Sequence, residues 1–573
     1  MDTPQLGDPM TDRWNDPACA SSLLVVLVVA TSGCATPGRM LRGYAEAEPT
    51  ELALLETGGA FADAPPHLRG QVRFAFDAFG SLSTDALKEG ALPWKLVVAV
   101  LALDRHEATG APISLNTAYG VFEEFGFLRP RRIANWHGPQ PRLERPLGIV
   151  SGIARRGFPS VELEISAFGC AMCHGGALYG ADGRPTGDAW LGLPNTSLDL
   201  SAFGSAVSLA LERQLPREDA LLEATVTIFP RVSDNELSVL RKHVIPAARE
   251  KLIPSVEDGD GAPSFEHGGP GLMNGVAVAR RSLGRLEHDA LTTEVAWTSP
   301  PDLSETTMRK ALLIDAMYAP AGSDRFGPRT RADIAAEGLR DFADMTTLFV
   351  FTTFGQPKLA RDKVDRVRDL VSFFDRMTPP PFPGDVDTLL AAEGEQVYNA
   401  ACAACHGNYS PGTKDVRLLE HPNRLVAQDR MGTDAARWET VDSASLAVIA
   451  GLGWEDQISK RNFGGYVAPD LSGVWATAPY LHNGSVPTLW HLLHAEQRPD
   501  RFMVGGHALD YALMGIAGEV DEDGDYVYPS GYEPWSHSML YDTHEPGRSN
   551  AGHEFPGLSA EQKTALLEYL KVL

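Results

Sequence analysis

Two five-residue segments carry the clearest chemistry in this sequence, because each has the pattern Cys-x-x-Cys-His. Two thiols three positions apart lie beneath the vinyl groups of a haem, and the histidine that follows reaches the iron. Thioether bonds then fix the macrocycle, and the histidine becomes its proximal ligand. The motifs predict two c-type haems, one held by Cys170, Cys173 and His174 and the other by Cys402, Cys405 and His406.

Zinc binding and thiol redox chemistry are the two alternatives for such motifs. A zinc site built from two Cys-x-x-Cys pairs has them about 15 to 20 residues apart. Here the first cysteines of the pairs are Cys170 and Cys402, which are far more distant. A thioredoxin-type pair needs a βαβ context, which the surrounding sequence does not suggest. Haem attachment is therefore the favoured interpretation.

The N-terminal segment indicates export. Residues 20–30 form an apolar run that is too short to span a bilayer and has the length of a signal-peptide core. The run leads to Thr31-Ser32-Gly33-Cys34, which resembles the lipidation site of bacterial lipoproteins, although Thr31 departs from the usual leucine or valine. We expect an exported protein of the periplasm or cell surface. Lipidation of Cys34 stays open, and a buried or unstructured apolar stretch is the alternative.

The charge of the chain indicates which kinds of molecule it binds, and its cysteine content indicates whether it forms disulfides. The 573 residues include 50 basic and 75 acidic side chains, a formal charge of −25, and no basic stripe that would suit nucleic acid. An acidic surface suits a small redox carrier with a basic face, but it also serves solubility alone. Outside the two motifs only Cys19 and Cys34 remain, so no disulfide framework is expected.

The sequence predicts a mainly α protein with two cytochrome c-like haem domains and an N-terminal helical region. The apolar run Leu96–Leu103 reads as a core helix, and a helix is expected over Leu389–Ala401. Ser559 and Gln562 form a capping box that begins a C-terminal helix. The expected parts are a leader (1–34), a helical region (35–165), the first haem domain (166–376), a Pro-rich linker (377–387) and the second haem domain (388–573).

From Pro379 onward the chain resembles the di-haem cytochrome c peroxidase superfamily. The resemblance rests on residues 394–407, which read GEQVYNAACAACHG, and on residues 478–489, which read APYLHNGSVPTL. Residues 431–434, 496–502 and 547–554 resemble the branch that includes the di-haem rubber oxygenases, as do residues 192–195. The resemblance implies haem iron in both domains and electron transfer through the second haem. It also implies a structural role for His482, as a hydrogen-bonding residue near the haem or between the domains.

Departures from the peroxidase pattern concern the sixth ligands of the two irons. Where the peroxidases have a methionine that ligates the second haem, this chain has Glu496. The rubber-oxygenase-like pattern implies His553 as that ligand, with Met431 and Met503 as alternatives. His/His ligation lowers the reduction potential relative to His/Met ligation.

The first haem lacks the distal histidine of the peroxidases, because Trp190 stands at that position. We therefore expect an open sixth site at the first haem, where O2 or peroxide binds. The alternative is that His243, His267 or His288 closes the site.

Two further expectations concern tryptophans and calcium. Electron relay through tryptophan and plain packing both stay open for Trp190, Trp297, Trp475 and Trp490. The peroxidase resemblance leaves calcium open as well, but the acidic segments 257–260 and 521–525 fit solvated loops better.

Taken together, the sequence predicts a haem-dependent oxidoreductase that activates O2 or peroxide at the first haem and uses the second for electron transfer. A membrane-tethered di-haem electron-transfer protein without catalytic activity is the alternative. The substrate, the catalytic residues around the first haem and the oligomeric state are not predicted.

Overall fold

The computed structural model describes residues 48–49, 63–77, 92–156, 161–249, 267–276, 295–323, 326–353, 360–440, 453–460 and 462–573. The expected leader, Cys34, His288 and the acidic segment 257–260 lie outside these residues. Within them, no helix combines the length and apolar character that crossing a membrane requires.

The expectation of a mainly α protein is wrong, because the described residues are about 40% helix and 16% strand, and their strands form seven small sheets, a mixed α/β architecture. Most strands have two to five residues, too short for sequence periodicity to reveal, and they exist through long-range pairing. The expected N-terminal helical region also contains a long hairpin of β3 (Ile149–Arg156) and β4 (Val161–Phe168). Its alternation of buried Leu163 and Ile165 with glutamates was a visible strand signal.

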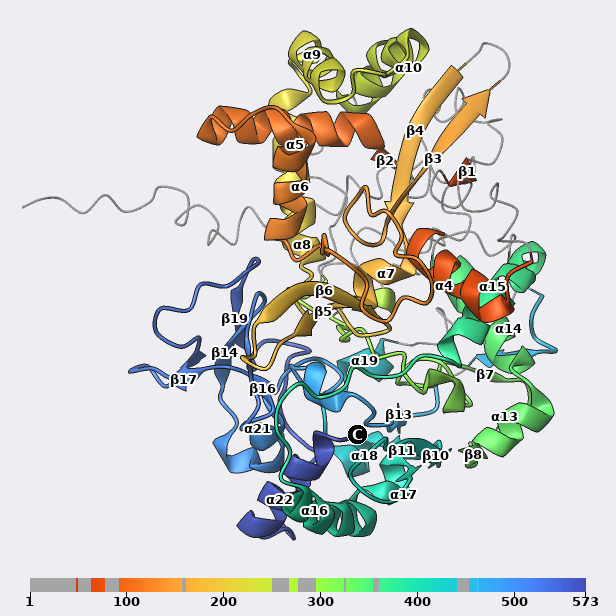
Figure 1. Ribbon diagram of the computed structural model, residues 1–573, viewed down its shortest axis with the longest axis vertical. Helices are drawn as coiled ribbons and strands as arrows, with labels where there is room; N and C mark the ends of the chain where they lie inside the picture. Colours follow the sequence, from red (N-terminus) through yellow and green to blue (C-terminus); the bar gives the residue numbers. More distant parts are fainter. Residues whose placement is uncertain are drawn as a thin grey trace, which may run out of the picture.

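The lower half of Figure 1 contains the helix pair of the second haem region. Helix α16 (Thr388–Ala401) packs on the C-terminal helix α22 (Ala560–Leu570) and leads into α17 (Ala403–His406). The capping box of Ser559 and Gln562 is confirmed at the start of α22, and the helix expected from Leu389 is confirmed as α16.

A second helix pair with the same packing lies beside the first haem motif. Helix α4 (Pro66–Phe76) packs on α15 (Ala360–Phe374), and α7 (Cys170–Cys173) holds the motif. At both crossings a glycine lets the helices approach. A Cβ on Gly70 would lie 2.6 Å from the carbonyl carbon of Asp369 and 2.8 Å from the Cβ of Phe373. A Cβ on Gly394 would meet Ala565 and Tyr569 at the same two distances.

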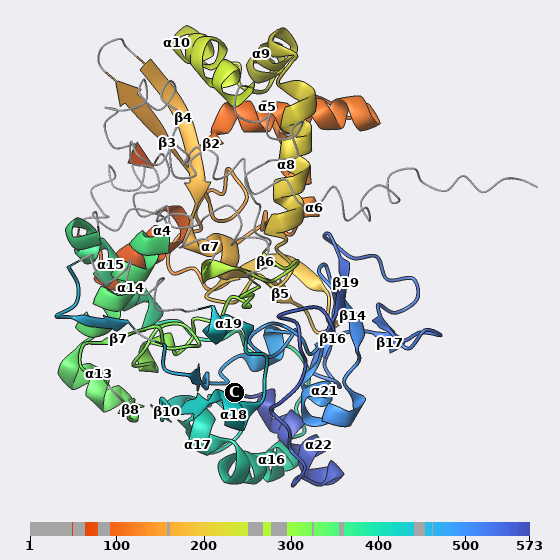
Figure 2. The same cartoon turned by 180° about the vertical axis from the view of Figure 1, so that it is seen from behind.

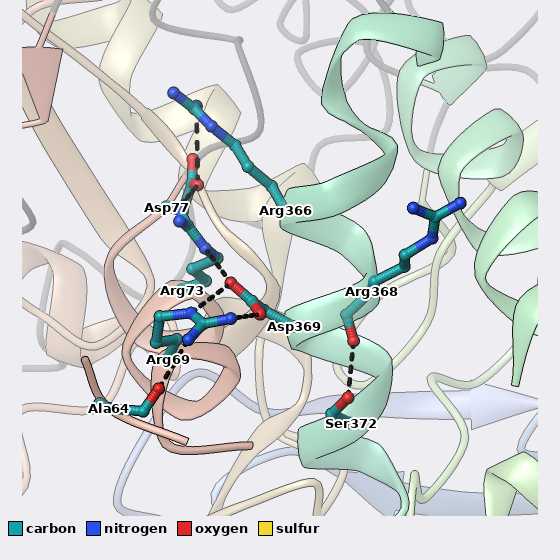
Figure 3. Close-up of polar contacts among 8 residues, drawn as sticks. All are labelled: Ala64, Arg69, Arg73, Asp77, Arg366, Arg368, Asp369 and Ser372. Carbon is teal, nitrogen blue, oxygen red and sulfur yellow. Dashed lines mark hydrogen bonds and ion pairs between the residues drawn. The ribbon is translucent and has the colours of Figure 1, made fainter. Parts of the chain in front are cut away.

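The α4–α15 pair is further held by a partly buried ion cluster (Figure 3). Asp369 of α15 accepts two hydrogen bonds from Arg69, at 2.6 and 2.9 Å, and one from Arg73 at 3.3 Å. Arg73 and Arg366 also pair with Asp77, which closes the cluster. Helix α4 therefore belongs with the first haem motif, although the sequence placed it in a separate N-terminal region.

A long insertion separates α4 from α7 and forms the upper part of the molecule, seen from both sides in Figures 1 and 2. Its four-stranded sheet has the order β1-β3-β4-β2, and helices from both sides of the haem motif pack beside it. The insertion and its neighbours comprise β1 (Glu48–Pro49), β2 (Leu92–Pro93), α5 (Trp94–Thr109), α6 (Leu115–Glu124), α8 (Leu200–Gln214), α9 (Glu218–Ile228), α10 (Asp234–Val239) and the π-helix η3 (Leu240–Val244). Helix α5 contains the apolar run Leu96–Leu103 in the core, as expected.

Small sheets join the expected domains. Strand β7 (Tyr318–Pro320) pairs with β12 (Ile458–Lys460), and β8 (Arg329–Thr330) pairs with β10 (Leu418–His421). Both pairs connect the segment expected as the first haem domain with the second. The remaining elements of the segment expected as the first haem domain are β5 (Gly175–Tyr179), β6 (Pro185–Leu191), the 3-10 helix η5 (Thr306–Met308), α13 (Arg331–Glu337) and α14 (Arg340–Thr353).

The C-terminal region adds short elements around α16 and α22. They are β9 (Asn408–Tyr409), β11 (Leu425–Ala427), α18 (Gln428–Met431), α19 (Ala436–Glu439), β13 (Gly465–Val467), η7 (Val474–Ala476), α21 (Leu489–Leu493), η8 (Ala495–Gln497), β14 (Arg501–Val504), β15 (Leu509–Asp510), β16 (Gly515–Ile516), β17 (Glu519–Val520), β18 (Tyr526–Val527) and β19 (Met539–Asp542). Residues 377–387, the expected linker, contain no helix or strand.

Candidate haem sites

Each Cys-x-x-Cys-His motif forms one turn of helix that ends at its histidine. The backbone N–H of His174 donates to the Cys170 carbonyl, and that of His406 donates to the Cys402 carbonyl, both at 3.0 Å. Burial raises the pKa of the Cys170 and Cys173 thiols to about 12 and that of Cys402 to about 11. A thiol redox pair needs a depressed pKa, so these thiols do not suit such chemistry.

Both motif histidines are held by the same second interaction. His174 donates from Nδ1 to the Pro301 carbonyl oxygen at 3.0 Å, and His406 donates from Nδ1 to the Pro469 carbonyl oxygen at 2.7 Å. Burial lowers the pKa of both imidazoles, that of His174 to about 4, so each ring is neutral. A proton on Nδ1 leaves the Nε2 lone pair free for a metal, which is the state required of a proximal haem ligand.

The two prolines open a repeat that the sequence interpretation missed. Pro301 begins Pro-Asp-Leu-Ser in the first PDLS repeat (residues 299–318), and Pro469 begins the same four residues in the second PDLS repeat (residues 467–486). The Asp302 and Asp470 carboxylates accept from the N–H of Ser304 and Ser472. An identical tetrapeptide with a constant spacing of 168 residues was a signal available from the sequence.

The two PDLS repeats share their backbone fold. Left-handed backbone occurs at Glu305, Leu313 and Ala316 in the first repeat and at Gly473, Leu481 and Gly484 in the second, each pair 168 residues apart. Both repeats contain a 3-10 turn, η5 and η7, at equivalent positions. The bridge between Leu312 and Tyr318 likewise recurs between Tyr480 and Val486.

The repeats also contact each other reciprocally. The N–H of Ser299 donates to the His482 carbonyl at 2.8 Å, and the N–H of Val467 donates to the Ile314 carbonyl at 2.7 Å. Ser299 and Val467 are equivalent positions of the two repeats, as are Ile314 and His482. Because the two hydrogen bonds are reciprocal, the two PDLS repeats are related by an approximate two-fold axis. Each motif histidine is therefore held by one copy of the repeat, and the copies are bonded to each other.

Buried carboxyls lie directly after both histidine-binding carbonyls. Burial raises the pKa of Asp302 to about 7, and the nearby Asp470 raises it further. Burial also raises the pKa of Asp470, against the opposing effect of Arg309. Both carboxyls are therefore easier to protonate than a solvent-exposed aspartate.

His553 lies opposite His406. The two ring centres are 5.9 Å apart and the ring planes are perpendicular. Two imidazoles bound to one iron on opposite faces have ring centres about 6 Å apart, since each metal–nitrogen bond is about 2 Å and each ring centre lies about 1 Å behind its nitrogen. The Nδ1 atom of His553 is buried without a hydrogen-bond partner, and burial with the nearby His406 lowers its pKa to about 3. These residues fit a haem between them.

The methionine alternatives are placed differently. The carbonyl of Met431 accepts the backbone N–H of His553 at 3.1 Å, so its backbone supports the histidine. Met503 lies in β14 and pairs with Leu540 of β19. Ligation of the second haem is still a prediction for all three side chains, and the ring geometry favours His553.

His482 is buried and neutral, because burial lowers its pKa to about 3. Its ring packs on Tyr466, and its backbone carbonyl makes the contact between the PDLS repeats. A structural role is consistent with this position.

His243 and His267 are the two described candidates for the sixth ligand of the first haem iron, and neither is placed as a free ligand. His243 is part of η3, one of the elements that neighbour the insertion. The Nδ1 atom of His267 accepts the backbone N–H of Asn274 at 3.2 Å, which places its proton on Nε2 and leaves no lone pair free. The sequence of residues 346–360, which leads into α15, contains no His, Met or Cys.

The four tryptophans make ordinary packing and hydrogen-bond contacts. Trp190 donates to the Thr378 carbonyl and Trp475 to the Pro380 carbonyl, so both contact the Pro-rich segment. Trp297 lies under the guanidinium of Arg548, and Trp490 stacks on His494. Trp475 of the second PDLS repeat corresponds to Thr307 of the first.

The acidic turn 521–525 uses its carboxylates internally. Asp521 accepts the backbone N–H groups of Asp523 and Asp525, and Asp525 pairs with Arg501 at 2.8 Å. Among the described residues no cluster of three or more His, Cys, Asp or Glu side chains offers a metal site. Calcium binding stays a prediction without structural support.

Comparison with known proteins supports a cytochrome c assignment. Residues 465–503 match the family model described as RoxA-like, cytochrome c-like, and this segment contains the whole second PDLS repeat. The match supports haem binding and electron transfer through a c-type haem. It does not reach either Cys-x-x-Cys-His motif.

Two curated relatives come from Sinorhizobium fredii (strain NBRC 101917 / NGR234). The uncharacterized protein y4iM is 29% identical over 231 residues, which cover 34% of this chain and 48% of the relative. The uncharacterized protein y4iJ is 29% identical over 266 residues, covering 35% of this chain and 42% of the relative. The chain therefore spans less than half the length of these relatives.

Proposed function

We propose that this protein is an exported di-haem c-type cytochrome and an oxidoreductase that uses O2 or peroxide at the haem of His174. The observation that carries the two-haem proposal is that His174 and His406 each donate from Nδ1 to the carbonyl oxygen of the equivalent proline in one of the two PDLS repeats. The matching glycine crossings of the two helix pairs support it independently. A c-type haem supplies one-electron exchange at its iron.

The second site is proposed to serve electron transfer, with His406 and His553 as the two ligands. Both rings are neutral and buried, and they face each other at a separation that suits one iron. Closing both faces excludes substrate from the metal and leaves electron exchange as its role.

The first site is proposed to be the reactive one, with His174 as proximal ligand. The sequence that leads into α15, residues 346–360, contains no His, Met or Cys, and the Nδ1 atom of His267 already accepts a hydrogen bond. An accessible opposite face lets a small oxidant reach the metal.

Export, a lipid anchor at Cys34 and electron exchange with a small basic carrier complete the proposal. They rest on the apolar N-terminal run, on the extracytoplasmic attachment of c-type haem and on the charge of −25.

Ligand binding to the purified holo-protein tests the division of roles. We expect one haem to be high-spin and to bind cyanide or CO, and the other to be low-spin and resistant. His553→Ala should convert the second haem to the high-spin form and open it to cyanide. If both haems of the unaltered protein resist external ligands, the catalytic proposal falls and the electron-transfer alternative stands.

A further inference from the structure

The loop that carries His553 (residues 547–554, here the His553 loop) is held by segments distant in the sequence. Asn483 of the second PDLS repeat donates from Nδ2 to the carbonyls of Gly547 and Ser549, at 3.2 and 3.0 Å. The backbone N–H of Ser549 donates to the Asp434 carboxylate at 3.2 Å. These contacts fix the first half of the loop, before the histidine.

Arg498 fixes the second half. Its Nη1 donates to the carbonyls of Asn550 and Gly552, the latter at 2.8 Å. Its Nη2 donates to the carbonyl of His553 itself at 3.1 Å, and to that of Leu492 in α21. Its Nε donates to the carbonyl of His491. All five N–H donors of a guanidinium are therefore used, three of them on the His553 loop and two on α21.

On its other side the His553 loop packs tightly against residues 431–433. Gly552 has φ +78°, and a Cβ there would lie 2.5 Å from both the Met431 carbonyl oxygen and the Thr433 nitrogen. His553 is itself left-handed, with φ +51°, and its N–H donates to the Met431 carbonyl. The histidine thus sits in a sparsely populated backbone conformation that only surrounding contacts maintain.

We propose that Arg498 is the positioning residue for His553, and that it locks the imidazole in place opposite His406 so that the second haem stays closed. The proposal rests on the proposed function, in which His553 ligates that haem. The proposal also explains why residues 431–434, 496–502 and 547–554 belong together. The first two segments contact the third, which is the His553 loop. The charged, planar fork of arginine suits the task, since it bonds several carbonyls in fixed directions.

The test compares Arg498→Gln with unaltered holo-protein of full length. We expect a high-spin fraction at the second haem, cyanide binding there at least about tenfold faster, and recovery of the low-spin spectrum on adding imidazole. Arg498→Lys keeps the charge with fewer donors and should give a smaller effect. Gly552→Ala disturbs the loop from the other wall and should reproduce the spectral change, which covers the case that Arg498→Gln does not fold.

Arg501→Gln is the matched control. Arg501 lies three residues further along the same segment and pairs with Asp525 at 2.8 Å, away from the His553 loop. The Arg501→Gln variant should leave both haem spectra unchanged. Its cyanide binding measures the contribution of the first haem alone. If Arg498→Gln and Gly552→Ala match this control while His553→Ala becomes high-spin, the positioning role is refuted and ligation by His553 survives. If His553→Ala is also unchanged, ligation itself fails and the positioning role fails with it.

Discussion

The paired glycine crossings lead to a quantitative prediction about the two helix pairs. Replacing Gly70 or Gly394 by alanine adds one methyl group at equivalent positions of α4 and α16. In each case the new carbon would lie 2.6 Å from a carbonyl carbon and 2.8 Å from a Cβ of the partner helix. Backbone cannot move aside as a flexible side chain can, so the helices must separate by roughly 1 Å.

The expected cost follows from two opposing contributions. Overpacking of this kind costs about 3 kcal/mol. Alanine in a helix interior returns about 1 kcal/mol relative to glycine. We therefore expect each variant to lose about 2 kcal/mol of unfolding free energy, and the two losses to be similar because the crossings are alike.

Urea unfolding of the holo-protein, followed by haem absorbance and by helix content, measures these losses. Gly120→Ala in α6 is the control, because a Cβ there has no atom within 4 Å, and it should be neutral or stabilising by up to about 1 kcal/mol. The reasoning is refuted if Gly70→Ala and Gly394→Ala behave like Gly120→Ala. A large loss at only one of the two sites would contradict the equivalence of the helix pairs.

Two further predictions concern the ion cluster and pH. Asp369→Asn removes the charge that binds Arg69 in two places and should lower the unfolding free energy by about 1–2 kcal/mol; Asp365→Asn on the same helix, at a side chain that is 90% exposed, should change it by less than about 0.5 kcal/mol. His482 has a pKa lowered to about 3 by burial, so its contribution to stability is complete above about pH 6.5 and is lost as the pH falls toward 3. Between pH 6.5 and 5 that loss is about 2 kcal/mol, and His482→Gln should show a shallower dependence of the urea midpoint on pH. An equally steep dependence in that variant would assign the effect to other buried histidines.

Local signals in the sequence predicted local structure correctly. The helix expected from Leu389 begins at Thr388, because Asp387 caps it by accepting two backbone N–H groups. The capping box of Ser559 and the core helix over Leu96–Leu103 were also correct. Each depends on residues within a few positions of one another, which one chain segment displays in full.

Features made by distant segments were not predictable in the same way. Helix α4 belongs beside the first haem motif, yet residues 77–169 separate them, and only the packing of Gly70 on α15 reveals the partnership. The two-residue strands exist because a distant strand completes their hydrogen bonds. The PDLS repeat was visible in the sequence, but its meaning depends on the two histidines that its prolines bind.

The candidate site was predictable in part. The Cys-x-x-Cys-His pattern itself predicts the two attachment cysteines and the proximal histidine, whereas His553 was suggested only by resemblance to a family. The structure adds the 5.9 Å separation from His406, which no sequence pattern encodes. Arg498 carries no sequence signal of its role, because its contacts are to backbone carbonyls, which any residue supplies.

The mass of the purified holo-protein, measured after denaturation, tests the central claim most directly. Covalent attachment at both motifs predicts a polypeptide that carries two haems, and a Cys170→Ala, Cys173→Ala variant that retains one. The claim is contradicted if the unaltered protein carries a single covalent haem and the variant carries that same single haem. The first motif would then bind no haem.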